Sequence, residues 1–158
     1  MFRPLQRKKQ EIALKECLEI LKQEKRGVLS ILGENGYPYG VPINHYYSEE
    51  DGCLYFHGGK NGHKLDAIAE NNKASYCVLD EGQKEEGGWA LHFRSVIVFG
   101  KIEMIDEEET VRDIAYRLSR KFTDDEEYIQ DEMRRTLKAT AAFRLIPEHI
   151  SGKRVNES

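Results

Sequence analysis

A glycine-rich turn near the middle of the sequence has the residue types that bind a phosphoryl group. The candidate residues of this turn are His57, Gly58, Gly59, Gly62, His63 and Lys64. Glycines let backbone N–H groups approach an anion closely, and the unpaired N–H groups at the start of a helix favour that anion. Lys64 and His63 add a fixed and a titratable cation at a position where helices usually carry acidic residues. The turn therefore predicts a phosphate cradle, and a plain turn from a hairpin into a helix is the alternative.

Two common phosphate motifs do not describe this turn. No Gly-Lys-Ser/Thr follows at the spacing of a P-loop, and the G-x-G-x-x-G pattern of dinucleotide-binding folds is absent. The predicted cradle is thus of another type.

Metal and hydrolase chemistry receive little support from the sequence. The five histidines form no H-E-x-x-H pair, and the three cysteines do not lie near them. No G-x-S-x-G elbow is present, and the serines of the predicted strands lack a nucleophile's setting. We therefore expect no metal site and no Ser-His-Asp site.

Further polar residues could complete a site around the cradle. Asn44 and His45 end a predicted strand beside the one that feeds the turn, and both side chains can hydrogen-bond a planar heterocycle. Arg94 and Ser95 lie within another strand, where an outward-facing arginine is an equally good interpretation. Together these residues predict a phosphorylated, aromatic ligand; Lys153 could add charge or belong to a solvated tail.

The elements that would position these residues are mostly strands. The predicted strands are 28–32, 37–47, 53–57, 74–80, 89–105 and 140–146, and the predicted helices are 7–24, 64–70, 106–121 and 124–135. Consecutive hairpins predict an antiparallel meander or barrel, mainly β with flanking helices in the α+β sense. Gly100 predicts a bend or bulge in the long strand, and Pro147 is expected to end the last one. A short basic tail, 148–154, is expected after it.

Local signals place one of the strands at an edge of the sheet. Asn35-Gly36 is a strong hairpin signal between the first two strands. Pro38 and Pro42 cannot donate to a hydrogen-bond ladder, so their strand is expected at an edge or with a bulge.

Composition limits the class of protein. The chain has 158 residues, enough for a single domain spanning 1–158 with a sizeable core. No apolar run reaches the ~20 residues of a membrane helix, and the N-terminus lacks the apolar region of a signal peptide. Three dispersed cysteines favour reduced thiols in the cytoplasm. The net charge of -4 gives no general attraction for nucleic acid.

Four sequence segments in the same order resemble the pyridoxamine 5′-phosphate oxidase-like superfamily, and within it the nitroimidazole-resistance proteins. These segments are GYPYGVPINHY at 36–46, LYFHGG at 54–59, GHK at 62–64 and SVIVFGK at 95–101. The closing ISGK at 150–153 is also similar to that branch. The resemblance implies a six-stranded antiparallel split β-barrel that binds FMN at the interface of a homodimer.

The resemblance also implies roles for particular residues. Contacts to the isoalloxazine ring, the ribityl chain or the phosphate are implied for Pro42, Ile43, Asn44, His57, Gly58, Gly59, His63, Lys64, Arg94, Ser95, Val96 and Lys153. Of these, Lys153 would approach the flavin from the partner subunit. His57 is the candidate catalytic residue, as a proton donor.

Two classes of function follow. The first is an FMN-dependent oxidoreductase that uses NAD(P)H to reduce a small acceptor, such as a nitroaromatic compound. The second is a non-catalytic flavin or haem binding protein, in which His45 or His92 would be an axial ligand. Direct oxidation of pyridoxamine phosphate is a weaker third, because the sequence offers no second basic cluster for that substrate.

Overall fold

A single antiparallel sheet organises the computed structural model, which describes residues 1–84 and 86–156. Its strands are β1 (Arg26–Leu32), β2 (Pro38–Asn44), β3 (Tyr46–Tyr47), β4 (Leu54–Gly59), β5 (Lys73–Leu79), β6 (Gln83–Lys84), β7 (Leu91–Ile105) and β8 (Thr140–Asn156). They lie in the order β2-β1-β5-β7-β8-β4-β3, and β6 pairs with β7. Six of these strands are long, so the predicted antiparallel, mainly β fold with flanking helices is confirmed.

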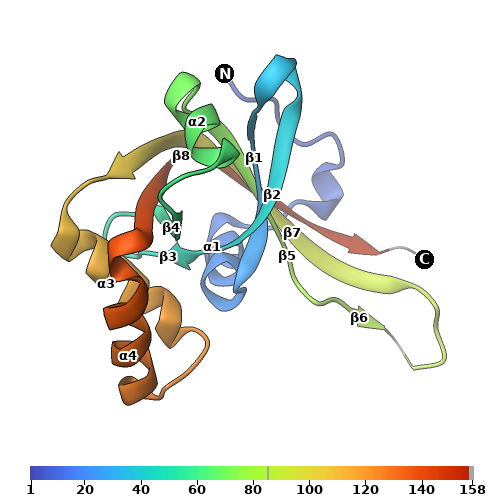
Figure 1. The fold of residues 1–158 in the computed structure, drawn as a ribbon. Helices are drawn as coiled ribbons and strands as arrows, with labels where there is room; N and C mark the ends of the chain where they lie inside the picture. The colour runs from blue at the N-terminus through green and yellow to red at the C-terminus, as the bar shows by residue number, and fades with distance from the viewer. Residues whose placement is uncertain (85, 157–158) are drawn as a thin grey trace.

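Four helices and three short 3-10 turns flank the curled sheet (Figure 1). The helices are α1 (Leu14–Gln23), α2 (His63–Glu70), α3 (Glu108–Arg120) and α4 (Glu126–Thr136), and the turns are η1 (Lys8–Gln10), η2 (Glu34–Gly36) and η3 (Leu137–Ala139). In Figure 1, α3 and α4 lie together at one end of the sheet, and β6 extends from the other. No helix among the described residues has the length and apolar character needed to cross a membrane.

The inner face of the sheet carries the main core. Alternate residues of each strand point inward, as the two-residue period of a strand requires, and Tyr76, Val96 and Phe143 are fully buried there. Helix α1 adds Ile20 and Leu21 to this core, and α2 adds a shorter apolar face. The inner face is therefore closed by helices that come from two different parts of the chain.

The outer face is covered only in part. Helix α3 packs Val111, Ile114 and Leu118 against Ala142 of β8. Over β1, β5 and β7 the outer face stays open, and large apolar side chains are exposed there: Val28, Leu32, Leu79, Ile97 and Phe99. Cross-strand pairing puts Val28, Cys77 and Ile97 in one row across the three strands. The sheet thus has one helix-covered outer region and one bare apolar region.

The hairpin and edge predictions are confirmed. Asn35 and Gly36 both have positive φ, 58° and 75°, which an Asn-Gly pair tolerates. Strand β2 lies at the edge of the sheet and pairs only with β1, a position in which the missing N–H groups of Pro38 and Pro42 are tolerated.

The expected end of the last strand at Pro147 is wrong. Strand β8 continues to Asn156, and residues 148–154 are part of it, not a tail. The register of β7 and β8 shifts between Phe99 and Gly100, so Gly100 faces Pro147 and Phe99 faces His149. Glu148 is the extra residue of this bulge. The bulge that Gly100 predicted also accommodates the proline, whose missing N–H falls where the ladder is interrupted.

Two other boundaries differ from the sequence prediction. Helix α1 begins at Leu14 because the preceding residues bind the end of β8. The N–H of Ile12 donates to the carbonyl of Gly152 at 3.1 Å, and the backbone of Glu11 forms an isolated antiparallel β-bridge with Lys153. The predicted strand 37–47 is interrupted at His45, whose N–H donates to Lys25 instead of to the sheet. Tertiary hydrogen bonds decide both boundaries.

Candidate functional site

The turn predicted to be a phosphate cradle lies where β4 ends and α2 begins. Gly58 and Gly59 pair with Ala141 and Thr140 at the end of β4. Gly62 precedes α2 with φ 141°, a conformation that favours glycine, and no side chain caps the first turn of the helix. The backbone N–H groups of this first turn are therefore available to an anion.

Lys64 lies over the end of β4. Its ammonium is 5.6 Å from the centre of the Phe143 ring. A Cβ atom on Gly58 would meet the Lys64 Nζ at 2.9 Å, so only glycine leaves this space to the ammonium. Desolvation lowers the pKa of Lys64, and no ion pair joins it to a carboxylate in the described part of the chain. A partly buried ammonium without a counter-charge suits an anionic ligand.

His63 points to a different neighbour than Lys64 does. Its ring stacks on Tyr39 of β2 at 4.4 Å, and its Nε2 accepts a weak hydrogen bond from the N–H of Glu34 at 3.4 Å. This histidine holds the β1–β2 hairpin against the start of α2. The structure thus assigns His63 a positioning contact.

Asn44 ends β2, and His57 lies near the end of β4. Both side chains line one cavity of about 250 Å³, which α3 and α4 close on the other side. Two of the residues predicted to contact or border a ring system therefore line the same cavity.

The electrostatics of this cavity favour a neutral His57. Desolvation lowers the pKa of His57, and the positive charge of Lys64 lowers it further. The His57 ring nitrogens make no hydrogen bond with the described residues, although the side chain reaches solvent. Asn44 accepts a hydrogen bond at Oδ1 from the Nε of Arg26 at 2.9 Å, which leaves its Nδ2 free to donate.

Pro42 and Ile43 differ in exposure. Pro42 is exposed at the edge of the bare outer face, because it pairs with Val28. Ile43 packs against the main core, and its carbonyl accepts a hydrogen bond from the hydroxyl of Tyr76 at 2.8 Å. Of these two side chains, Pro42 is the one open to a ligand.

Arg94, Ser95 and Lys153 lie at the other end of the sheet. Ser95 pairs with Lys153, whereas His57 pairs with Ala142. Eleven residues of β8 separate Ala142 from Lys153, which is roughly 35 Å along a strand. These residues and the cradle are therefore far apart along the sheet of one chain.

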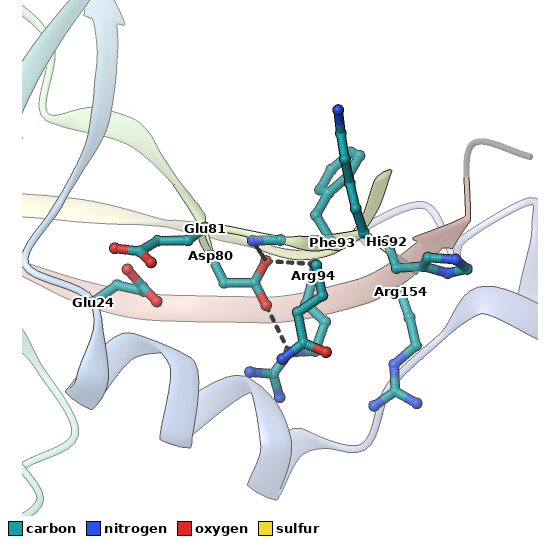
Figure 2. A pocket seen from close by; sticks show the side chains of 10 residues that line it. Glu24, Asp80, Glu81, His92, Phe93, Arg94 and Arg154 are labelled. Atoms are coloured by element: carbon teal, nitrogen blue, oxygen red, sulfur yellow. Dashed lines mark hydrogen bonds and ion pairs between the residues drawn. The ribbon is translucent and has the colours of Figure 1, made fainter. Parts of the chain in front are cut away.

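Arg94 is already neutralised where it lies. Its Nε is 2.8 Å from an oxygen of Asp80, and its Nη1 is 3.1 Å from Glu16. Figure 2 shows this contact with Asp80 in a cavity of about 730 Å³, which Glu24 and Arg154 also line. Hydrogen bonds to Asp80 and then to Glu16 raise the pKa of Arg94.

Ser95 and Val96 face opposite sides of the sheet. Val96 is fully buried among the core side chains of the inner face, so no ligand can reach it in this chain. Ser95 points to the outer face, as Ile97 does two residues later.

His45 cannot be an axial haem ligand. It is completely buried, with Nε2 2.6 Å from the carbonyl oxygen of Leu21 and Nδ1 2.7 Å from the hydroxyl of Tyr76. Both ring nitrogens have partners in the core, so that part of the haem hypothesis is wrong. No cluster of metal-ligating side chains occurs in the described residues.

Sequence reasoning missed the helical wall of the cavity. Tyr128 and Ser119 line it from α4 and α3, and Phe122 lines it from the connection between these helices. In the sequence these residues show only the pattern of two amphipathic surface helices, and nothing in it indicates that they meet Asn44 and His57.

Comparisons with known proteins agree on the fold. The family model for pyridoxamine 5′-phosphate oxidase matches residues 14–154. No curated protein matches the chain in sequence.

Several solved structures are similar. A candidate 5-nitroimidazole antibiotic resistance protein from Bacteroides thetaiotaomicron has a TM-score of 0.75 and 21% identity, over 92% of this chain and 87% of that one. An FAD-binding protein from Mesorhizobium loti has a TM-score of 0.69 and 23% identity, over 92% and 96%. An FAD and haem binding protein from Mycobacterium smegmatis has a TM-score of 0.71 and 22% identity, over 92% and 72%. At these identities the likeness shows the fold.

Proposed function

This chain belongs to the pyridoxamine 5′-phosphate oxidase family, and on that basis we propose that it is an FMN-dependent oxidoreductase that reduces a small acceptor with electrons from NAD(P)H. Flavin binding is supported by similar folds that are described as FAD-binding. A nitroaromatic acceptor is supported by the similarity to the candidate nitroimidazole resistance protein.

The residues present fit a flavin with a phosphoryl end. The cradle offers the ammonium of Lys64, the open N–H groups at the start of α2 and the glycine backbone of Gly58. Asn44 and His57 lie beside it and could border the edge of a planar ring. Lys64 and the start of α2 would hold the phosphoryl end of FMN, which would supply the redox chemistry that links oxidation of NAD(P)H to reduction of the acceptor.

The protein's own part in this reaction is to bind, orient and supply a proton. Lys64 would neutralise the phosphoryl group, and His63 would hold the β1–β2 hairpin in place. The Nδ2 of Asn44 can donate a hydrogen bond to a ring carbonyl or nitrogen. His57 stays neutral by desolvation, so its one N–H can hold a proton next to the acceptor.

A homodimer would complete the site. Ser95 and Lys153 lie on the same outer face as Val28 and Ile97, which are 42% and 37% exposed. A bare apolar face of this kind is suited to a second copy. Because Lys153 is roughly 35 Å along β8 from the cradle of its own chain, we propose that it serves the cradle of the partner.

The observation that carries the proposal is the ammonium of Lys64 at the start of α2, which has no ion pair among the described residues. The experiment is to add FMN to the purified protein, measure the visible flavin absorbance and the Kd, and then follow NAD(P)H oxidation with and without a nitroaromatic acceptor. Bound flavin with acceptor-dependent oxidation supports the proposal. If no flavin binds at micromolar concentrations, the proposal fails.

A non-catalytic carrier is the second candidate, favoured by the similar fold that is described as FAD and haem binding. In that case the protein would hold its cofactor but would not oxidise NAD(P)H with any acceptor. His92 is the remaining histidine of the original haem hypothesis, and it lines the cavity of Figure 2. A shifted Soret band on addition of haem, lost in His92→Ala, would favour this reading.

We also propose a cytoplasmic location. Cys17, Cys53 and Cys77 are all free thiols, as is common in a reducing compartment.

A further inference from the structure

The cavity between β4 and the two C-terminal helices has a size and lining of its own. Its volume of about 250 Å³ equals roughly eight water molecules at ~30 Å³ each. That space suits a single substituted five- or six-membered ring. It is smaller than the usual range for a whole cofactor site, roughly 300–1,000 Å³.

The lining is apolar at the base and aromatic at the rim. Leu118 and Met133 are buried and form part of the base. Phe122 and Tyr128 are 46% and 55% exposed and lie at the rim. Two aromatic rings at the entrance of an apolar space favour a flat guest that can stack on them.

The hydroxyl groups along the helical wall are mostly occupied. Ser119 donates to the carbonyl of Ala115, and Thr136 donates to the carbonyl of Glu132, both at 2.8 Å. Thr140 likewise donates to Thr136 at 2.8 Å. These three side chains therefore have no proton left for a ligand.

Four donors around the cavity donate no hydrogen bond to the described residues. They are the Nδ2 of Asn44, the N–H of His57 and the hydroxyls of Thr123 and Tyr128. Glu132 also lines the cavity, and its carboxylate accepts a hydrogen bond from Arg135 at 2.9 Å. A ligand that meets the four unused donors should carry acceptor oxygens, as a nitro group does.

We propose that this cavity is the subsite for the electron acceptor, and that Tyr128 and Phe122 select a single planar ring bearing acceptor oxygens. The proposal rests on the proposed function, because Asn44 and His57 would lie between this ring and the flavin. Tyr128 recognises the acceptor oxygens through its hydroxyl, and Phe122 stacks on the ring. The α3–α4 pair is then the part of the fold that sets acceptor specificity.

The test measures binding separately from turnover. The flavin-loaded protein, without NAD(P)H, is titrated calorimetrically with 4-nitrobenzyl alcohol and with benzyl alcohol, which lacks the nitro group. Tyr128→Phe should raise the Kd of the nitro compound roughly two- to tenfold, the worth of one neutral hydrogen bond, and leave that of benzyl alcohol unchanged. Phe122→Ala should weaken both.

Tyr116→Phe is the matched control. Tyr116 lies on α3, its hydroxyl is bound to Glu126, and it does not line this cavity. The Tyr116→Phe variant should bind 4-nitrobenzyl alcohol, benzyl alcohol and the flavin with the same Kd values as the parent protein. Tyr128 is largely exposed, so its loss of a hydroxyl should leave the fold intact.

The outcomes separate the two proposals. If Tyr128→Phe binds the nitro compound as the parent does, or if the parent does not bind it at all, the subsite lies elsewhere, whatever the turnover. If binding depends on Tyr128 but no acceptor supports NAD(P)H oxidation, the subsite stands and the oxidoreductase function fails.

Discussion

The Nδ1 atom of His45 lies 2.7 Å from the hydroxyl oxygen of Tyr76, and both side chains are fully buried. The carbonyl of Leu21 can only accept, so the proton of His45 lies on Nε2. The single hydroxyl proton of Tyr76 is then shared between Nδ1 of His45 and the carbonyl of Ile43, which lies 2.8 Å from the same oxygen. This pair connects α1, β5 and the break between β2 and β3 in the centre of the core.

The first prediction concerns acid stability. Burial lowers the pKa of His45 from 6.5 to about 3, and the charge of Lys121 adds to this. Below pH 6.5 the His45 imidazole binds a proton in the unfolded chain but not in the folded chain. The free energy of unfolding therefore falls by up to ~1.4 kcal/mol per pH unit as the pH is lowered. Urea unfolding between pH 6.5 and 3 measures this slope. His45→Gln should be less stable at neutral pH but should show a smaller slope, and an unchanged slope would contradict the assignment.

The second prediction concerns Lys121, whose ammonium donates to the carbonyls of Glu24 and His45 at 2.7 Å each. Desolvation lowers its pKa from 10.5 to about 8. Between these values the unfolded chain holds more protons, so this group makes stability rise with pH. The deprotonated Lys121 amine still has two N–H donors, one each for the carbonyls of Glu24 and His45. Lys121→Met should cost roughly 1–3 kcal/mol at neutral pH and should remove that rise in a series of urea unfolding curves.

The third prediction concerns the bulge in the long strands. A Cβ atom on Gly100 would overlap the backbone carbonyl of Ile146, which cannot move without disturbing β8. Gly100→Ala should therefore lower the free energy of unfolding by roughly 1–3 kcal/mol or more. Gly59→Ala is the control, because a Cβ there has its nearest neighbour at 3.9 Å. Equal stabilities of the two variants would count against the close approach at the bulge.

The fourth prediction concerns the cradle. Lys64→Met keeps the length of the side chain but removes the charge, so the Kd for FMN should rise roughly tenfold to a hundredfold, the worth of a charged hydrogen bond. Fluorescence titration with FMN measures it. Lys73→Met, beyond the other end of α2, should bind as the parent does. Unchanged affinity in Lys64→Met would place the phosphoryl group elsewhere.

The fifth prediction concerns the homodimer. If each site takes Lys64 from one chain and Lys153 from the other, a mixed dimer of Lys64→Met and Lys153→Met chains contains one intact site. Random exchange makes about half of the dimers mixed, and one of the two sites in each mixed dimer is intact. Parent affinity should therefore return at about a quarter of all sites. Flavin titration of the re-equilibrated mixture measures this fraction. No restored sites in a confirmed mixed dimer would show that Lys153 does not serve the partner's cradle.

Local signals were sufficient for much of the fold. Alternating apolar residues predicted the strands, Asn35-Gly36 predicted the first hairpin, and Pro38 and Pro42 predicted the edge position of β2. Each of these features depends on backbone conformation within a few residues. The bulge at Gly100 was predicted for the same reason.

Local signals failed where distant partners compete. Pro147 would end an isolated strand, but the bulge opposite Gly100 removes the need for its N–H. His45 resembled a free ligand in the sequence, but Leu21 and Tyr76 bind both of its ring nitrogens. No local pattern contains these partners.

The sequence by itself determined the strands, the glycine cradle and the type of residue at each position, because these depend on neighbours along the chain. Only the tertiary structure decided which residues share a site. It brought Asn44, His57 and Tyr128 to the same cavity. It also put Lys153 at the far end of β8. The reason is that sheet register and helix packing join segments whose separation in sequence is large, and residue types alone do not encode those distances.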